Sequence, residues 1–118
     1  MAVKDKIIKH QKAIRSVLQE YADERSHALG NTLDYQVIAD TEGNHFQLVR
    51  LGWANGTYHH FLLFHLDIKP DTGKIWIQQN NTEFLIGEAL INKGVERMDI
   101  VLGFRSAQMR ENTAFAVA

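Results

Sequence analysis

The longest apolar and aromatic run of the chain, Tyr58 to Ile68, predicts a central β-strand. The two-residue period of a strand sorts its side chains into two faces. One face is predicted to carry Tyr58, His60, Leu62, Phe64, Leu66 and Ile68, and the other His59, Phe61, Leu63, His65 and Asp67. Both faces are partly apolar, so this strand is expected inside a sheet and not at its edge.

Three further segments have strand character and lie close to the central strand in sequence. They are Asp34 to Asp40, His45 to Ala54 and Lys74 to Gln79. The connections between them are short and have turn composition, namely Thr41 to Asn44, Asn55-Gly56 and Pro70 to Gly73. Such short connections predict an antiparallel meander of four strands in sequence order.

Helical spacing of apolar residues appears on both sides of these strands. Lys4 to Glu24 predicts an amphipathic helix, and a second helix is expected to be capped by Asn80, Asn81 or Thr82 and to end at Lys93-Gly94. The fold predicted for residues 1–118 is therefore a single α+β domain: a four-stranded antiparallel meander with an N-terminal helix and a C-terminal helix packed on it.

The last quarter of the chain is less clearly patterned. Val95 to Phe104 is apolar and short, so its period does not separate a strand from a buried turn. Ser106 is expected to cap a last short helix through Arg110, and the apolar end Phe115 to Ala118 is expected to dock on the domain.

Composition narrows the class of protein. A chain of 118 residues with 45% hydrophobic residues can bury the core of one domain. The absence of Cys excludes disulfides and thiolate metal sites and agrees with a cytoplasmic protein. No signal-peptide pattern and no apolar run near the roughly 18 residues of a membrane span are present, so we expect neither export nor membrane insertion.

Charge is nearly balanced over the whole molecule but not along the first helix. A net charge of -1 provides no general attraction for nucleic acid, so DNA contact would need a local patch. The first half of the helix is basic, whereas Glu20, Asp23 and Glu24 lie at its end. This order opposes the helix macrodipole by about 0.3 to 1 kcal/mol per exposed charge.

Three interpretations of that charge order remain open: a solvated face, a phosphate contact, or a partner helix. The third predicts a homodimer in which two copies of the helix pair antiparallel, with apolar mid-helix residues such as Val17 supplying affinity. The cations that could contact DNA or a partner are Lys4, Lys9, Lys12, Arg15, Arg105 and Arg110.

Motifs for catalysis or cofactor binding are nearly absent. The sequence has no Gly-rich phosphate loop, no His-Glu-x-x-His helix and no nucleophile elbow, and we predict no cofactor. His65 and Asp67 share a strand face about 6.6 Å apart, which makes them weak candidates for a metal site. A credible site needs three or four ligands, and strand histidines are more often structural hydrogen-bonding groups.

Several segments resemble the XisI-like family, named for the fdxN element excision controlling factor of heterocyst-forming cyanobacteria. The resemblance is carried by Asp99 to Ser106, Arg110 and Phe115 to Ala118, by Asp40 to Glu42, His45 to Leu48 and Gly52-Trp53, by His65 to Lys69 and Gly73 to Gln78, and by Thr82-Glu83 and Gly94-Val95. It covers essentially the whole chain in order. Ala107 departs from the family, which commonly has Pro after the Ser.

The resemblance implies a non-catalytic accessory protein of programmed DNA excision. Such a protein would work with a site-specific recombinase and with a companion, the XisH-like protein, and the family supplies no catalytic residues. Direct DNA binding through the basic half of the first helix, and an unrecognised enzyme or metal-binding protein, are the alternatives.

Overall fold

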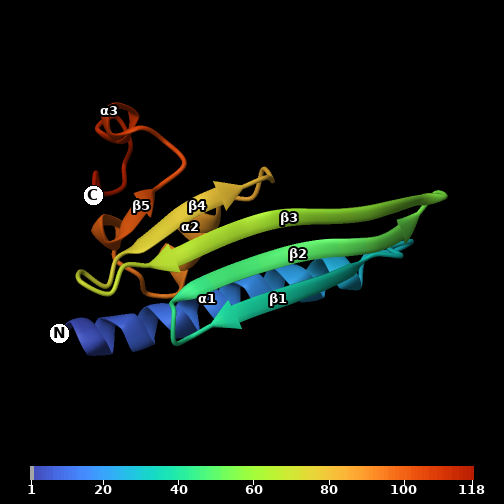
Figure 1. The fold of residues 1–118 in the computed structure, drawn as a ribbon, viewed down its shortest axis with the longest axis horizontal. Helices are drawn as coiled ribbons and strands as arrows, with labels where there is room; N and C mark the ends of the chain where they lie inside the picture. The colour runs from blue at the N-terminus through green and yellow to red at the C-terminus, as the bar shows by residue number, and fades with distance from the viewer. Residues whose placement is uncertain (1) are drawn as a thin grey trace.

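A computed structural model of the chain describes residues 2–118 as an α+β fold, with a five-stranded sheet in the order β1-β2-β3-β4-β5 (Figure 1). The elements are α1 (Val3–Ser26), β1 (Asp34–Asp40), β2 (His45–Ala54), β3 (Thr57–Ile68), β4 (Ile75–Asn80), α2 (Ile86–Asn92), the 3-10 turn η1 (Arg97–Asp99), β5 (Ile100–Leu102) and α3 (Ala107–Arg110). No helix within residues 2–118 has the length and apolar character needed to cross a membrane.

Strands β1 to β4 form the predicted antiparallel meander. The β2–β3 hairpin turns on Asn55 and Gly56, whose φ angles are 53° and 75°. Positive φ at both central residues is what a type I′ turn requires, and Asn and Gly tolerate it best. The turn therefore agrees with the right-handed twist of the two long strands and fixes their pairing.

The sheet has one strand more than predicted. β5 pairs parallel with β4, through Ile75 with Ile100 and Ile77 with Leu102. A parallel neighbour needs a crossover connection, and α2 and η1 supply it. Val95 to Phe104, for which the sequence left a strand and a buried turn as alternatives, contains a 3-10 turn and then three strand residues. The turn is only partly buried, since Met98 is 61% exposed.

The prediction that six alternate residues of β3 share one face is wrong. In the β2–β3 ladder Leu48 lies opposite Phe64 but Val49 lies opposite Leu62, so Leu63 is an extra residue and the register shifts there. An extra residue in a strand reverses the alternation of every side chain beyond it. Phe64, Leu66 and Ile68 therefore face the helices, whereas Leu62 and the residues that alternate with it toward the hairpin face the opposite side.

α1 and α2 cover the same face of the sheet, as predicted. Both helices lie behind the strands in Figure 1, and their buried side chains form one cluster with those of β2, β3, β4 and β5. Phe64 is completely buried in this cluster. Its ring meets Tyr21 of α1 edge-on at a centroid distance of 5.1 Å and lies 6.2 Å from Phe84.

α2 begins later than predicted. Its N-cap residue is Leu85, not Asn80, Asn81 or Thr82. Asn80 Oδ1 instead accepts from the backbone N–H of Thr82 at 2.9 Å, and Thr82 Oγ1 accepts from the N–H of Phe84 at 3.0 Å. Asn and Thr side chains can hydrogen-bond to nearby backbone groups in turns as well as at helix N-termini. Here they stabilise a turn before α2.

The C-terminal end docks on the domain, as expected. Ala116 is buried and forms a parallel bridge with Val101, and its N–H donates to the carbonyl of Ile100 at 2.9 Å. Phe115 packs on α2 so closely that a Cβ at Gly87 would lie 2.7 Å from the ring. Ser106 caps α3, its hydroxyl oxygen accepting from the N–H of Met109 at 3.3 Å.

His10 is a fully buried polar side chain on the inner face of α1. Its Nδ1 lies 2.6 Å from the carbonyl oxygen of Gly73, so this nitrogen carries the proton and donates. Nε2 lies 3.9 Å from Asp99 Oδ2. Burial lowers the pKa of His10 below its ordinary value, although the Gly73 hydrogen bond and the charge of Asp99 both act to raise it.

This environment predicts a pH-dependent stability. As the pH falls, His10 in the unfolded chain binds a proton near its ordinary pKa of 6.5, whereas His10 in the folded chain binds one only at a lower pH. The contribution of His10 is complete above that pH and is lost as the pH falls toward the folded pKa. We therefore expect the urea unfolding free energy to fall from about pH 7.5 to 5.5 more steeply in the wild type than in His10→Gln. Parallel curves for the two proteins would contradict this interpretation.

Candidate functional site

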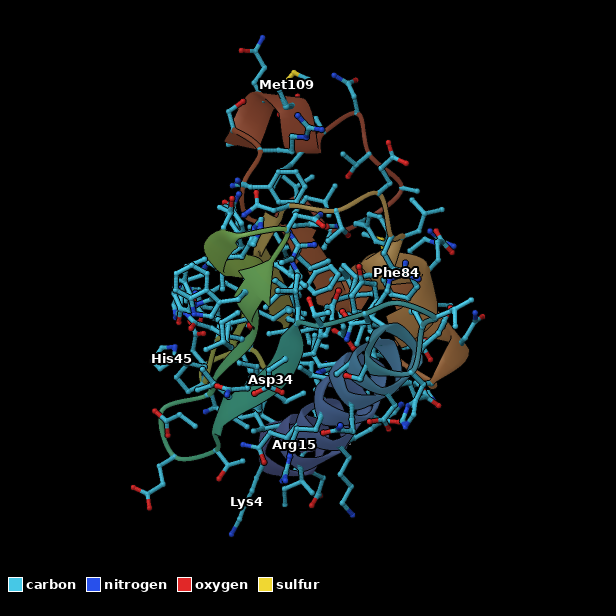
Figure 2. All side chains as sticks on the ribbon, turned by 90° about the vertical axis from the view of Figure 1, so that its right-hand side faces the viewer. Lys4, Arg15, Asp34, His45, Phe84 and Met109 are labelled. Atoms are coloured by element: carbon cyan, nitrogen blue, oxygen red, sulfur yellow. The ribbon has the colours of Figure 1, made fainter. Side chains whose placement is uncertain are left out.

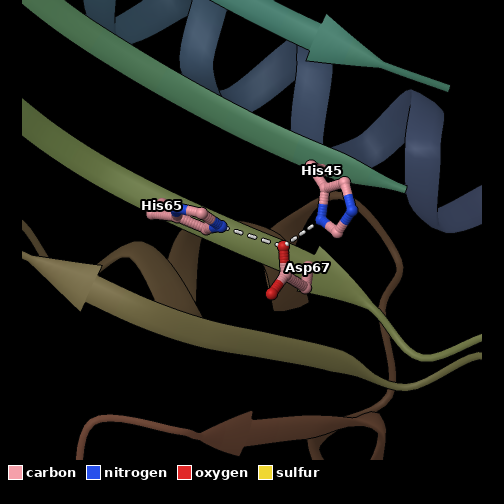
Figure 3. Close-up of side chains that lie close together, drawn as sticks. All are labelled: His45, His65 and Asp67. Carbon is pink, nitrogen blue, oxygen red and sulfur yellow. Dashed lines mark hydrogen bonds and ion pairs between the residues drawn. The ribbon is translucent and has the colours of Figure 1, made fainter. Parts of the chain in front are cut away.

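Two histidines and one aspartate meet on the open face of the sheet, on the side away from α1 and α2. Antiparallel pairing places His45, the first residue of β2, directly opposite Asp67 of β3. His65 lies two residues before Asp67 and therefore on the same face. Figure 3 shows both rings pointing at the Asp67 carboxylate, and Figure 2 shows His45 on the outer side of the sheet.

One carboxylate oxygen accepts from both rings. Asp67 Oδ1 lies 2.7 Å from His45 Nδ1 and 2.9 Å from His65 Nε2. An ionised carboxylate only accepts, so each of these ring nitrogens carries a proton. His45 thus donates through Nδ1 and His65 through Nε2.

Two glutamines hold the other side of this cluster. Gln78 Nε2 donates to Asp67 Oδ2 at 3.1 Å, and Gln47 Nε2 lies 2.9 Å from His65 Nδ1, the unprotonated ring nitrogen. Gln78 is available because the β3–β4 ladder also shifts register, leaving this residue extra between Ile77 and Gln79. Both carboxylate oxygens and both nitrogens of His65 thus have partners.

The carboxyl of Asp67 is held in its ionised form. Burial acts to raise its pKa, but the hydrogen bonds from His45, His65 and Gln78 outweigh burial, and the pKa of Asp67 is lowered. The side chains are 59% exposed for His45, 27% for His65 and 17% for Asp67. The cluster therefore offers an ionised, partly buried carboxylate and two imidazoles with solvent on one side.

The sequence identified two members of this cluster and missed the third. His65 and Asp67 are brought together as their spacing predicted, but His45 was not considered because it is 22 residues away from Asp67 in the chain. A signal was present: counting back from the Asn55-Gly56 turn pairs the start of β2 with the end of β3. The β2–β3 register shift makes that count uncertain by one residue.

The predicted basic surface of α1 is only partly continuous. Lys4, Lys12 and Arg15 are exposed on α1, and Figure 2 shows Lys4 and Arg15 pointing away from the sheet. Lys9 is half-buried and lies beside Gly94. Among residues 2–118 no carboxylate lies within 4.0 Å of any of these four cations. Their charges are thus free to meet a partner from outside the chain.

Part of the unusual charge order of α1 is explained by tertiary contacts. Lys6 Nζ lies 3.2 Å from Asp99 Oδ1, and Glu20 accepts from Lys93 at 2.8 Å.

The mid-helix residue expected to supply affinity in a homodimer, Val17, is 3% exposed and belongs to the core of a single copy. That part of the prediction is wrong, because period alone did not show how far the apolar stripe extends. Pairing of two α1 helices stays a prediction, without Val17.

A model of the family described as XisI protein matches residues 4–117. The chain belongs to the XisI protein family. The match includes the whole sheet, both packed helices and the cluster of His45, His65 and Asp67. No curated protein matches the chain.

Two solved structures have the same fold over nearly their whole length. An XisI-like protein from Anabaena variabilis ATCC 29413 is 36% identical, covers 95% of this chain and 99% of its own, and has a TM-score of 0.81. The fdxN element excision controlling factor XisI from the same organism is 27% identical, covers 96% and 99%, and has a TM-score of 0.76. The resemblance inferred from short segments is therefore confirmed.

In this XisI family chain, Arg110 holds the C-terminal segment in place. Its Nε donates to the carbonyl of Val117 and its guanidinium to the carbonyl of Arg105, both at 2.6 Å, and it lies 5.1 Å from the ring centre of Trp76. Arg105 lies over Phe104 and is exposed. The role of either cation in binding DNA or a partner stays a prediction, but Arg110 already has a structural one.

Proposed function

We propose that this XisI family member controls programmed, site-specific DNA excision as a non-catalytic accessory factor. The observation that carries this proposal is the whole-chain likeness to a protein named fdxN element excision controlling factor, with 96% of this chain and 99% of the other covered. Coverage that complete leaves no domain of the neighbour without a counterpart here. The recombinase that cuts and rejoins DNA would be a separate protein.

The described residues agree with an accessory role. A recombinase needs a Ser or Tyr nucleophile activated within a catalytic constellation. Tyr21 packs among core aromatic rings and Tyr58 stacks edge-on against Trp53. We infer that control is exerted through protein contacts, above all with an XisH-like companion encoded for the same process, in the cytoplasm.

Co-purification with the XisH-like companion tests this proposal. We expect the tagged wild-type chain to retain the companion, and Lys12→Gln with Arg15→Gln to retain it several-fold less, if the exposed cations of α1 contribute contacts. The matched control is Arg25→Gln with Lys93→Gln, which removes two positive charges near the acidic end of α1, one from its last turn and one from the residue that follows α2 and pairs with Glu20, and should have little effect. A wild-type chain that does not retain the companion would contradict the proposed partner.

Direct DNA binding is the second candidate function, favoured by the exposed and unpaired cations of α1. It predicts a gel-shift affinity that falls with salt by about one unit of log-log slope for each phosphate contacted. Lys12→Gln with Arg15→Gln should then lower the slope by about two units. Retention of the companion without a salt-dependent shift would favour control through protein contacts alone.

A further inference from the structure

We propose that His45, His65 and Asp67 bind a divalent transition-metal ion of the Zn²⁺ class on the open face of the sheet. One ligand atom from each residue lies within 4.8 Å of the other two. Two of the three come from β3 and one from β2, so the site is built on paired strands and not on a loop. This inference concerns metal binding itself and does not depend on a role in excision.

The ligand atoms are close enough together to reach one metal ion after their side chains shift. Zn²⁺ holds nitrogen and carboxylate oxygen at about 2.0 to 2.2 Å, which places neighbouring ligands of a tetrahedral site about 3.4 Å apart. The His45 and His65 nitrogens lie 2.7 and 2.9 Å from Asp67 Oδ1. Each nitrogen must therefore move away from the carboxylate oxygen by about 0.5 to 0.7 Å. The two nitrogens, which lie within 4.8 Å of each other, must approach by up to about 1.4 Å to reach the tetrahedral separation.

His45 is the residue best placed to make that adjustment. It is the first residue of β2, it directly follows a turn, and its side chain is 59% exposed. A rotation of its ring needs no change in the core. His65 and Asp67, which are more buried, would stay near their present positions.

Metal binding needs a free electron pair on each ligand nitrogen, which a neutral imidazole provides when its proton is on the other ring nitrogen. The proton on His65 Nε2 would move to Nδ1 and the proton on His45 Nδ1 to Nε2, leaving each ligand nitrogen with a free electron pair. His65 Nδ1–H would then donate to the side-chain oxygen of Gln47, after the Gln47 amide group rotates by about 180°. The Gln47 and Gln78 side chains would thus orient a ring and a carboxylate from behind, as residues behind metal ligands commonly do.

The ligand types select the metal class. Two imidazoles and one carboxylate suit Zn²⁺, Cu²⁺, Ni²⁺ and Fe²⁺, whereas Mg²⁺ and Ca²⁺ prefer ligands that are all oxygen. The solvent-facing side of the cluster leaves room for water or a group from another molecule to complete the coordination. The alternative is that the three side chains form a hydrogen-bonded cluster that only ties β2 to β3.

Calorimetric titration of the full, chelator-treated chain with ZnCl₂ distinguishes these alternatives. We expect saturable binding of one ion per chain, and at least about a tenfold weaker affinity in His45→Ala and in Asp67→Asn, because each removes a ligand. Gln47→Ala should keep the stoichiometry and weaken binding by roughly tenfold. The matched control is His60→Ala, an exposed histidine on the same outer face of β3, which should bind as the wild type does.

Co²⁺ provides an independent readout of the ligands. We expect visible absorption bands when Co²⁺ is added to the wild type and to His60→Ala, and their loss in His45→Ala. If His45→Ala does not fold by circular dichroism, His45→Gln replaces it. The proposal is overturned if the wild type shows no saturable Zn²⁺ binding, or if His45→Ala and His60→Ala weaken binding equally.

Discussion

Replacing Phe64 by Ala is expected to lower the free energy of unfolding by about 3 to 5 kcal/mol, the usual cost of removing a core aromatic ring. Phe64 is 0% exposed and contacts rings from α1 and from the loop before α2, Tyr21 and Phe84. Its loss leaves a cavity where the two helices meet the sheet. Calorimetry should show the melting temperature lowered by roughly 10 to 20 °C.

Phe61→Ala is the matched control for this change. Phe61 is on the same strand but is 48% exposed, with the Arg50 guanidinium 5.4 Å from its ring centre. Its removal should cost well under half as much, because less apolar surface leaves the core. Nearly equal effects of the two substitutions would contradict the placement of Phe64 at the centre of the core.

The meander was predictable because its signals are local. Short turns of fixed composition separate runs that alternate, and Asn55-Gly56 alone favours one turn type. The predicted bounds of Asp34–Asp40 and His45–Ala54 are those observed. Helix α1 was equally clear, since its apolar residues follow one period for most of its length.

The faces of β3 were not predictable from alternation. Period two assumes that every residue of a strand has one partner, and Leu63 has none. Leu62, Leu63 and Phe64 are all apolar, so nothing in their order indicates which one is extra. The parallel partner of β4 was missed for a related reason, because Ile100 to Leu102 is too short to show any period.

Only part of the candidate site could be predicted from the sequence. His65 and Asp67 are two residues apart, so strand geometry alone brings them together. His45 joins them only through the register of two strands, and Gln78 joins through the β3–β4 register shift. Local spacing therefore predicts two of the three residues, whereas the complete cluster depends on long-range strand pairing.

Deleting Phe115 to Ala118 is expected to lower the free energy of unfolding by about 3 kcal/mol. Burying an aromatic side chain contributes roughly 1.5 to 3 kcal/mol, and the ring of Phe115 is partly covered by Gly87 and by Arg97, whose guanidinium lies 5.3 Å away. The deletion also leaves the buried carbonyl of Ile100 without the N–H of Ala116, which adds about 1 kcal/mol. Urea unfolding followed by tryptophan fluorescence measures the change.

A shorter deletion separates the docked residues from the exposed ones. Val117 and Ala118 are exposed, and their carbonyls accept from Arg110 and Lys74, side chains that water can also satisfy. Removing these two residues should therefore cost less than about 1 kcal/mol, as solvent-exposed hydrogen bonds contribute little. Phe115→Ala in the full chain should account for most of the larger deletion. If all three variants unfold at the wild-type urea concentration, the C-terminal strand contact does not stabilise the domain.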